Sequence, residues 1–287
     1  MALVTEENIT ELAVERWQTA HDPRLAELMA ALVRHLHDFA REVQLTEAEW
    51  MAAIQWLTSA GQACDDKRQE FILASDVLGL SMLVVQLNHR FDAAATPATV
   101  LGPFHIAGSP SLPYGGDMSE GLPGTPLYVT GTVRSVTGEP VAGAVLDVWQ
   151  ADEEGLYESQ IPTIDEARLR AVYASRDDGG YCVRTIAPRG YSIPMDGPVG
   201  GLMKGTDISH FRPAHVHFLI DTEGYERLIT HLFQAGAEYL ENDVVFGTKE
   251  TLVVEFQERP PGTTPAGDES EEPFLVAEYD FVLQPRG

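Results

Sequence analysis

The sequence has 287 residues, of which 44% are apolar, so it is long enough for about two domains with a full hydrophobic core. Its formal net charge of −25 argues against a nucleic-acid partner and against docking on an anionic membrane, because both attract clustered Lys and Arg. A neutral small molecule would not be repelled by this charge. The two cysteines, Cys64 and Cys182, are too few for a disulfide framework, which suits a reducing cytosol.

The N-terminus lacks the basic stretch followed by an apolar stretch that marks a secretory signal. The longest apolar stretch, residues 78–87, is too short and too interrupted to span a bilayer. We therefore expect a soluble, cytoplasmic protein without a membrane partner.

The first hundred residues are poor in Pro and rich in Ala, Leu and Glu, which indicates helices. Asp22 and Pro23 form a typical N-cap and first-turn pair. The apolar residues that follow recur on one helical face: Leu25, Leu28, Leu32, Leu36 and Phe39. Thr46 and Glu49 make a capping box at the start of a second helix.

A third helical segment is expected from about Lys67 to Phe91, and its apolar residues are too many for a single stripe. They are Phe71, Ile72, Leu73, Val77, Leu78, Leu80, Met82, Leu83, Val84, Val85 and Leu87. Such a helix needs cover from another domain, another subunit or a bound apolar ligand. We expect homodimerisation through these helices to provide that cover.

From about Thr96 onward Pro and Gly become frequent, and residues 101–124 indicate a long ordered loop. Short β-prone runs with turn signals between them follow at residues 127–133, 144–150, 172–175, 181–186, 215–220, 229–233, 252–256 and 274–283. The acidic, turn-rich residues 264–272 predict a solvated hairpin loop.

These patterns predict a mainly β fold with α structure. Residues 1–99 are expected to form a helical dimerisation domain with a linker. Residues 100–287 are expected to form an antiparallel β-sandwich domain. The sequence shows no internal repeat and no low-complexity tract.

His215 and His217 lie two positions apart in an apolar, β-prone run. Side chains two apart on a strand leave the same face of the sheet, so both imidazoles can reach one metal ion. Pro213 cannot donate to a ladder and marks the strand start or an edge. Arg212 places a fixed positive charge close to the same spot. By itself, the pair is also compatible with two polar residues on a solvated face.

Further motifs accompany this pair in a distinctive order. They are residues 100–104 (VLGPF), 147–152 (DVWQAD), 155–157 (GLY), 191–194 (YSIP), 196–200 (DGPVG) and 212–217 (RPAHVH). The helical part adds residues 68–72 (RQEFI) and 75–79 (SDVLG). With these motifs the chain resembles, over nearly its whole length, the intradiol ring-cleaving dioxygenases, which open catechols between their two hydroxyls.

The resemblance implies that residues 100–287 form a catalytic domain with non-haem Fe(III) held by Tyr157, Tyr191, His215 and His217. Phenolate is a hard anionic donor that favours ferric iron, whereas zinc sites favour Cys, His and carboxylate. Non-haem Fe(II) oxygenases commonly use two His and one carboxylate. Free tyrosine titrates near about pH 10, so only a strongly acidic metal would hold it ionised at neutral pH.

The resemblance also implies residue roles. The substrate binds through both oxygens as a dianion, Tyr191 leaves the metal and takes up a substrate proton, and O2 attacks the ring. Arg212 is expected to stabilise negative charge on the ring, because a preorganised cation in a dry site stabilises such charge strongly. Family members of this build are homodimers that can hold a phospholipid between their helical domains, and the apolar helix is consistent with this.

The substrate pocket implied by the matched motifs is lined by Leu73, Asp76, Val100, Leu101, Gly102, Pro103, Ile193, Pro194, Arg212 and Val245. Asp76 could accept a hydrogen bond from a third ring hydroxyl. His231, after Thr230, stands where the catechol-cleaving branch usually has Gln, and we expect it to lie near Arg212, around the ligands, rather than to be a ligand. The Thr230–His231 pair and residues 196–200 look more like the branch that acts on hydroxyquinol (1,2,4-trihydroxybenzene), with catechol or a chlorocatechol as the alternative.

Two readings from other classes stay open. Residues 131–148 also resemble transthyretin-like accessory modules, which are β-sandwiches without catalysis. Such modules have no need for Tyr157 and Tyr191 together with the two histidines. A hydrolase with a His-bound divalent metal would need a carboxylate as third ligand and would be colourless.

Overall fold

The computed structural model describes residues 3–66, 68–161, 163–164 and 166–287. By its internal contacts the chain divides into two compact units, Met1–Ser59 and Ala60–Gly287. The predicted domain boundary between residues 99 and 100 rests on the change in amino-acid composition there, and it stays a prediction. By internal contacts, residues 60–99 belong to the larger unit. Lys67, the predicted start of the third helix, lies outside the described residues.

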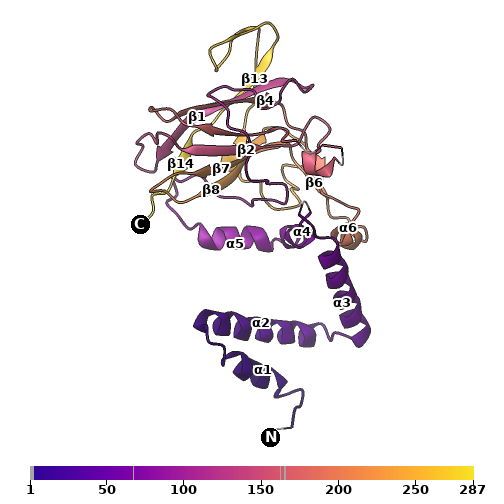
Figure 1. The fold of residues 1–287 in the computed structure, drawn as a ribbon. Coiled ribbons are helices and arrows are strands. Elements are labelled where there is room, and N and C mark those ends of the chain that lie inside the picture. Colours follow the sequence, from indigo (N-terminus) through magenta and orange to yellow (C-terminus); the bar gives the residue numbers. More distant parts are fainter. Residues whose placement is uncertain (1–2, 67, 162, 165) are drawn as a thin grey trace. The chain divides into compact units, whose positions relative to one another are not determined.

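The smaller unit is helical and is drawn in the indigo part of the ribbon (Figure 1). Its helices are α1 (Ile9–Trp17), α2 (Pro23–Glu42) and most of α3 (Glu47–Gln62). Both predicted helix starts are confirmed. The Asp22 carboxylate accepts a hydrogen bond from the backbone N–H of Arg24, and Thr46 and Glu49 exchange side-chain to backbone hydrogen bonds. The apolar face of α2 that follows Asp22 is exposed within the chain.

The third apolar segment forms two helices rather than the single one predicted: α4 (Glu70–Val77) and α5 (Leu80–Asn88). They meet at an angle of 79°. Gly79 lies at the break with φ +72°, in the left-handed region that other L residues rarely adopt, so glycine permits the bend. The bend lets one side of each helix reach the larger unit's core: α4 buries Leu73 and Asp76, and Val85 of α5 packs on the sandwich.

The outer side of α5 carries apolar side chains that are exposed among the described residues. Its exposed apolar side chains, together with Leu78 just before it, are 48–75% exposed: Leu78, Leu80, Leu83, Val84 and Leu87. Among the described residues, no single helix is long and apolar enough to cross a bilayer, and α4 and α5 pass that test of length and composition only as a bent pair.

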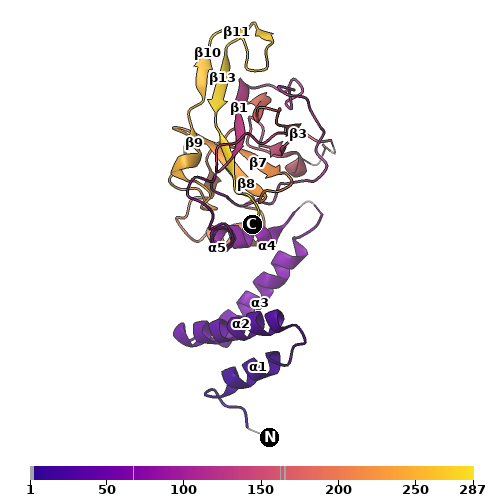
Figure 2. The same cartoon turned by 90° about the vertical axis from the view of Figure 1, so that its left-hand side faces the viewer.

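Two sheets form the body of the larger unit (Figure 1 and Figure 2). One has the order β3 (Arg170–Ala174), β2 (Val145–Trp149), β7 (His215–Asp221), β8 (Leu228–Gln234) and β9 (Val253–Val254). The other is centred on β1 (Pro126–Ser135) and adds β4 (Gly180–Ile186), β13 (Phe274–Glu278), β10 (Gln257–Arg259) and β14 (Phe281–Leu283). The predicted combination of helices with a β-sandwich is confirmed.

The sandwich is mainly but not wholly antiparallel. β1 pairs in parallel with β13 and β14, and β8 pairs in parallel with β9. Strand-forming residues and turn signals do not encode the direction of a neighbouring strand, so the sequence pattern cannot distinguish these pairs. The predicted strand at residues 252–256 is shortened, because the 3-10 helix η2 (Glu250–Leu252) precedes β9.

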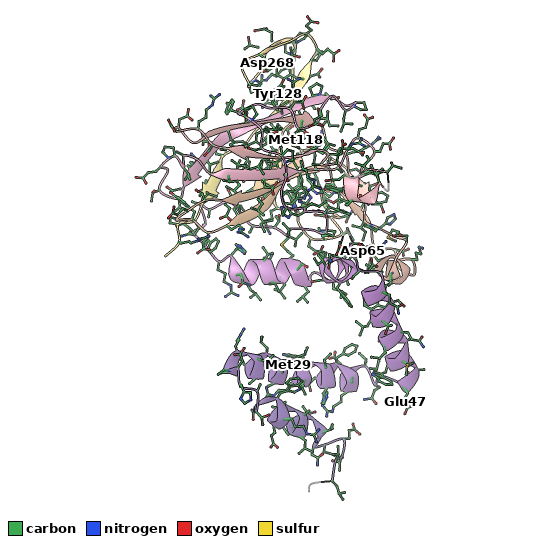
Figure 3. All side chains as sticks on the ribbon, viewed as in Figure 1. Met29, Glu47, Asp65, Met118, Tyr128 and Asp268 are labelled. Carbon is green, nitrogen blue, oxygen red and sulfur yellow. The ribbon has the colours of Figure 1, made fainter. Side chains whose placement is uncertain are left out.

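The core lies between the two sheets, and both contribute fully buried side chains. Members include Val129, Leu146, Val148, Val216, Phe218, Ile220 and Phe281. Met118, labelled in Figure 3, adds a side chain from the long loop. Val216 and Phe218 face this core, so the period of two turns His215 and His217 to the opposite face of β7.

Short elements close the ends of the sandwich. They are η1 (Glu158–Gln160), β5 (Tyr191–Ser192), α6 (Pro198–Met203), β6 (Phe211–Arg212), β11 (Gly262–Thr263) and β12 (Glu269–Ser270). The predicted hairpin at residues 264–272 is confirmed by the pairing of β11 with β12, and Asp268, labelled in Figure 3, lies on it.

Candidate metal centre and substrate pocket

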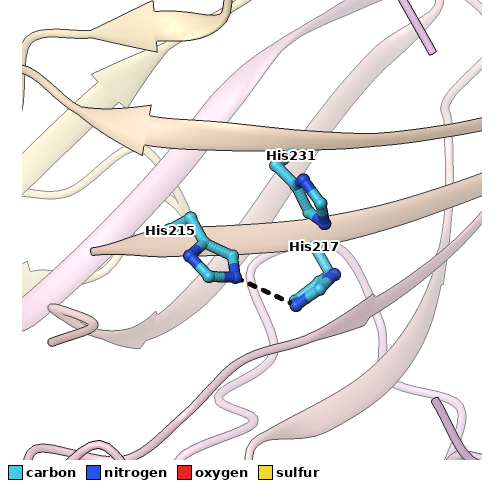
Figure 4. Close-up of side chains that lie close together, drawn as sticks. All are labelled: His215, His217 and His231. Atoms are coloured by element: carbon cyan, nitrogen blue, oxygen red, sulfur yellow. Dashed lines mark hydrogen bonds between the residues drawn. The ribbon is translucent and has the colours of Figure 1, made fainter. Parts of the chain in front are cut away.

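Three buried histidines lie on two neighbouring strands. His215 and His217 lie on β7, and His231 of β8 is directly opposite His217 in the ladder, so it shares the same face. Their ligand atoms all lie within 4.8 Å of one another (Figure 4). Nε2 of His215 is 3.1 Å from Nε2 of His217. This cluster could hold a metal ion.

Two tyrosines extend the cluster from other elements. Tyr157 caps η1 and Tyr191 begins β5. The Tyr157 hydroxyl is 3.0 Å from Nε2 of His217 and 3.4 Å from the Tyr191 hydroxyl. The structure thus brings together the four side chains that the resemblance implies as iron ligands, and all four are at most 5% exposed.

Burial sets the proton states of these groups. It raises the pKa of Tyr157, which the neighbouring Tyr191 raises further, and it raises the pKa of Tyr191 despite the charge of Arg212. Burial and the Arg212 charge lower the pKa of His215 to about 3. Burial also lowers the pKa of His217 and of His231 well below the usual range. The imidazoles are therefore neutral, the form that binds metals, and the phenols need a strong cation to ionise.

Hydrogen bonds fix the ring orientation. Nδ1 of His215 is 2.7 Å from the carbonyl oxygen of Pro213, which can only accept, so Nδ1–H donates and Nε2 turns its lone pair toward the cluster. Nδ1 of His231 is 2.9 Å from Oγ1 of Thr99. Among the described residues, Nδ1 of His217 and Nε2 of His231 have no hydrogen-bond partner. Trp149 stacks on the His217 ring with centroids 4.6 Å apart.

This donor set fits a ferric ion. Two ligands that each lie about 2 Å from one ion are about 2.8–3.4 Å apart at bond angles of about 90–110°. Neighbouring donor atoms here are 3.0, 3.1 and 3.4 Å apart. Two imidazoles with two phenols differ from the Cys, His and carboxylate sets that zinc favours. They also differ from the two His and one carboxylate that are common for Fe(II) oxygenases.

Arg212 lies beside the cluster as a buried cation. Its Nη1 is 3.1 Å from Nε2 of His215. Burial alone lowers the pKa of the guanidinium, but the charge of Asp243 raises it above its usual value, so the group stays protonated. The pairing of β5 with β6 places Arg212 directly opposite Tyr191.

A small pocket adjoins the cluster and contains most of the predicted substrate residues. It is lined by Leu73, Asp76, Val100, Gly102, Pro103, Phe104, Tyr191, Ile193, Pro194, Arg212 and Val245. Leu101 is not among them, and its side chain is 36% exposed. Its neighbours Val100 and Gly102 face the pocket instead.

Asp76 is the one carboxylate in this lining. It is 2% exposed, and its Oδ2 has no hydrogen-bond partner among the described residues. Burial raises the pKa of Asp76 to about 6, although a hydrogen bond from Ser81 and the charge of Arg212 both lower it. The carboxyl group is thus mostly ionised at neutral pH and has an oxygen free to accept.

A larger chamber of about 540 Å³ adjoins the small pocket and shares Leu73, Pro103, Phe104 and Pro194 with it. Its outer wall carries Arg68, which bonds to Asp196 and to the buried Glu70. The two spaces are therefore neighbours that share part of one wall.

Some residues of the site were not predicted. Phe104 stacks on Tyr157 with ring centroids 4.3 Å apart. The only feature of the sequence that could have pointed to Phe104 is its place in the motif at residues 100–104. Asp243, which pairs with Arg212, comes from a loop 31 positions away, and nothing in the sequence pattern marks it.

Comparison with known proteins agrees with this geometry. A family profile described as Dioxygenase matches residues 102–285, and one described as Catechol dioxygenase N terminus matches residues 22–96. The chain belongs to the intradiol ring-cleaving dioxygenases. It is therefore an enzyme, and the reading as a non-catalytic module is set aside.

Individual relatives cover almost the whole chain. The chain is 46% identical to a 6-chlorohydroxyquinol 1,2-dioxygenase of Cupriavidus pinatubonensis, over 98% of each chain. It is 44% identical to a hydroxyquinol 1,2-dioxygenase of Nocardioides simplex, over 98% of this chain and 96% of the relative. A solved hydroxyquinol 1,2-dioxygenase from Pseudomonas putida superposes with a TM-score of 0.89 at 46% identity, covering 98% of this chain and 99% of that one.

Proposed function

We propose that this dioxygenase cleaves hydroxyquinol with O2 between its two adjacent hydroxylated carbons, at a non-haem Fe(III) centre. Both oxygen atoms enter the product, 3-hydroxy-cis,cis-muconate, which tautomerises to maleylacetate. The observation that carries the choice of substrate is Asp76, a buried carboxylate with an unpartnered oxygen in an otherwise largely apolar pocket. The names of the most similar relatives point to the same substrate.

The iron would be held by Tyr157, Tyr191, His215 and His217. When bound, it would supply Lewis-acid chemistry toward a substrate with two adjacent hydroxyls. The third histidine of the cluster, His231, has its Nδ1 engaged with Thr99. We therefore assign His231 to the surroundings of the ligands rather than to the ligand set.

The protein's own groups then have separate tasks. The Tyr191 oxygen accepts a proton from a substrate hydroxyl, which its position in the pocket lining allows. The Arg212 guanidinium stabilises negative charge that develops on the ring, and its burial strengthens that effect. The apolar walls formed by Leu73, Val100 and Ile193 exclude water from the ring.

Asp76 distinguishes a triol from a diol. Its free oxygen accepts a hydrogen bond from the third hydroxyl of hydroxyquinol. Catechol has no hydroxyl at that position, so it would leave the buried carboxylate without a partner. Sites built to bond a substrate hydroxyl discriminate strongly against analogues that lack it.

Catechol or a chlorocatechol is the alternative substrate. The supporting observation is that the chain also resembles a catechol 1,2-dioxygenase from Pseudomonas arvilla, with a TM-score of 0.82 at 27% identity, covering 97% of this chain and 92% of that one. Oxygen uptake with hydroxyquinol, catechol and 4-chlorocatechol, compared by kcat/KM, tests the proposal. We expect the highest value for hydroxyquinol; a higher value for either diol would refute the substrate assignment.

We further propose a homodimer formed through the helical segment. The support is the apolar face of α2, whose side chains are 43–55% exposed within the chain: Leu25, Leu28, Leu32, Leu36 and Phe39. A face of this kind needs cover. Sedimentation of the protein beside Leu32→Glu tests this, with a shift toward monomer expected for the variant. A phospholipid as part of the cover stays a prediction.

A further inference from the structure

One carboxylate holds the buried Arg212 in a fixed orientation. Oδ1 of Asp243 accepts a hydrogen bond from Nε of Arg212 at 3.0 Å, and Oδ2 accepts one from Nη2 at 3.2 Å. The two side chains are 3% and 2% exposed. A two-point contact of this kind fixes the plane of the guanidinium as well as its position.

The contact decides which nitrogen of Arg212 faces the metal centre. Asp243 occupies Nε and Nη2, so Nη1 is left on the side of the cluster, 3.1 Å from Nε2 of His215. Arg212 lines the small pocket, whereas Asp243 does not. Any rotation of the planar guanidinium would therefore move the Nη1 donor away from the place where substrate charge develops.

Asp243 is itself held by the backbone of its own loop. Its Oδ1 also accepts from the N–H of Val245 at 3.3 Å, and its Oδ2 accepts from the N–H of Gly247 at 3.0 Å. Burial alone raises the pKa of Asp243, but the charge and hydrogen bonds of Arg212 hold it below its usual value, so the carboxylate stays ionised. Because Val245 lines the pocket, this carboxylate links the pocket wall to the guanidinium.

Gly247 leaves the space that this arrangement needs. A Cβ at this position would lie 2.9 Å from Oδ2 of Asp243, 3.1 Å from Nη2 of Arg212 and 3.5 Å from Nδ1 of His231. The first two distances are shorter than ordinary contacts. A side chain here would press on both members of the ion pair.

We infer that Asp243 and Gly247 are positioning residues that aim Nη1 of Arg212 at the reacting ring. The inference rests on the proposed function, in which Arg212 stabilises charge on that ring. Neither residue lines the small pocket, so both act through Arg212.

Asp243→Asn tests the inference with little change in volume. The new amide must turn its NH2 group toward N–H donors of Arg212, Val245 or Gly247, which breaks the two-point contact. In iron-loaded protein we expect kcat for hydroxyquinol to fall by about 10–100-fold, with a smaller change in KM and with wild-type iron content and resting colour. Asp221→Asn is the control, because Asp221 also accepts from Nε and Nη2 of an arginine, Arg227, but through Oδ2 alone and outside the pocket lining; wild-type kcat is expected.

Two more variants separate positioning from folding. Gly247→Ala should also lower kcat, with the carboxylate intact. In an Arg212→Ala background, Asp243→Asn should lower kcat no further, because the group through which it acts is gone. Wild-type kcat in both Asp243→Asn and Gly247→Ala would overturn the inference. So would a double variant in which Asp243→Asn lowers kcat by the same factor as it does with Arg212 present. Either result would leave the proposed function standing. Absence of hydroxyquinol turnover in the wild type would overturn both.

Discussion

The Tyr157 hydroxyl lies 3.0 Å from Nε2 of His217, although the two residues are 60 positions apart. Tyr157 reaches this place because it caps η1, and His217 because the alternation of β7 turns it away from the core. A buried phenol can donate a hydrogen bond to a neutral imidazole, which would satisfy both groups. Under the proposed function, both atoms instead bind one cation.

Replacing either tyrosine of the cluster should disable the enzyme. We expect Tyr157→Phe and Tyr191→Phe each to lower kcat by at least about 100-fold, because each removes an anionic donor from the metal and Tyr191→Phe also removes a proton acceptor. Steady-state oxygen uptake and metal analysis measure this. Tyr173→Phe is the control, since the Tyr173 hydroxyl is bound to the carbonyl oxygen of Gly116 away from the cluster. Full activity in both cluster variants would contradict the ligand assignment.

Asp76→Ala should weaken hydroxyquinol more than catechol. Loss of one buried hydrogen bond to the third hydroxyl predicts a relative penalty of about 1–3 kcal/mol in kcat/KM for hydroxyquinol. The two substrates serve as each other's control, because both lose the same wall contact. Equal losses for the two substrates would remove Asp76 as the selecting residue.

The raised pKa of Asp76 predicts a pH-dependent stability difference. Its pKa is about 6 in the fold against 3.8 as the ordinary value, so the folded state binds this proton more tightly. The stability contributed by this group is fully present below about pH 4 and is lost as pH rises through about 6. Relative to wild type, Asp76→Asn should therefore gain stability between these values, by on the order of 3 kcal/mol. Urea unfolding of the iron-free proteins at several pH values checks this; a difference that does not vary with pH would contradict it.

Glu70 should matter more for stability than an exposed glutamate. It is fully buried, its Oε2 accepts from Nε of Arg68 and its Oε1 accepts from the N–H of Val199, which ties α4 to α6. Glu70→Gln places an NH2 group against one of these donors, so the free energy of unfolding should fall by about 1–3 kcal/mol. Glu27→Gln, in the exposed pair with Arg24, should change it by less than about 1 kcal/mol. Equal changes in the free energy of unfolding for the two variants would show that the buried hydrogen bonds of Glu70 stabilise the protein no more than an exposed ion pair does.

Local patterns predicted the helix starts and the shared face of His215 and His217, because both follow from neighbouring residues. The tyrosines required the family resemblance, since no spacing rule connects Tyr157 or Tyr191 to a strand more than twenty positions away. The bend at Gly79 was missed because the apolar run continues through it.

The partner of Arg212 could not be predicted for a similar reason. Asp243 is an ordinary loop aspartate in the sequence, and only the folded chain brings it within 3.0 Å of Nε. The parallel pairing of β1 with β13 also depends on contacts between distant segments.

The visible absorption spectrum of the purified, iron-loaded protein tests the central claim most directly. Phenolate bound to ferric iron gives a charge-transfer band, so we predict a red-brown protein with about one iron per chain. The band should shift or fade in Tyr157→Phe and in Tyr191→Phe, and should persist in Tyr173→Phe. A fully metal-loaded but colourless protein would contradict the claim that Tyr157 and Tyr191 bind iron together with His215 and His217.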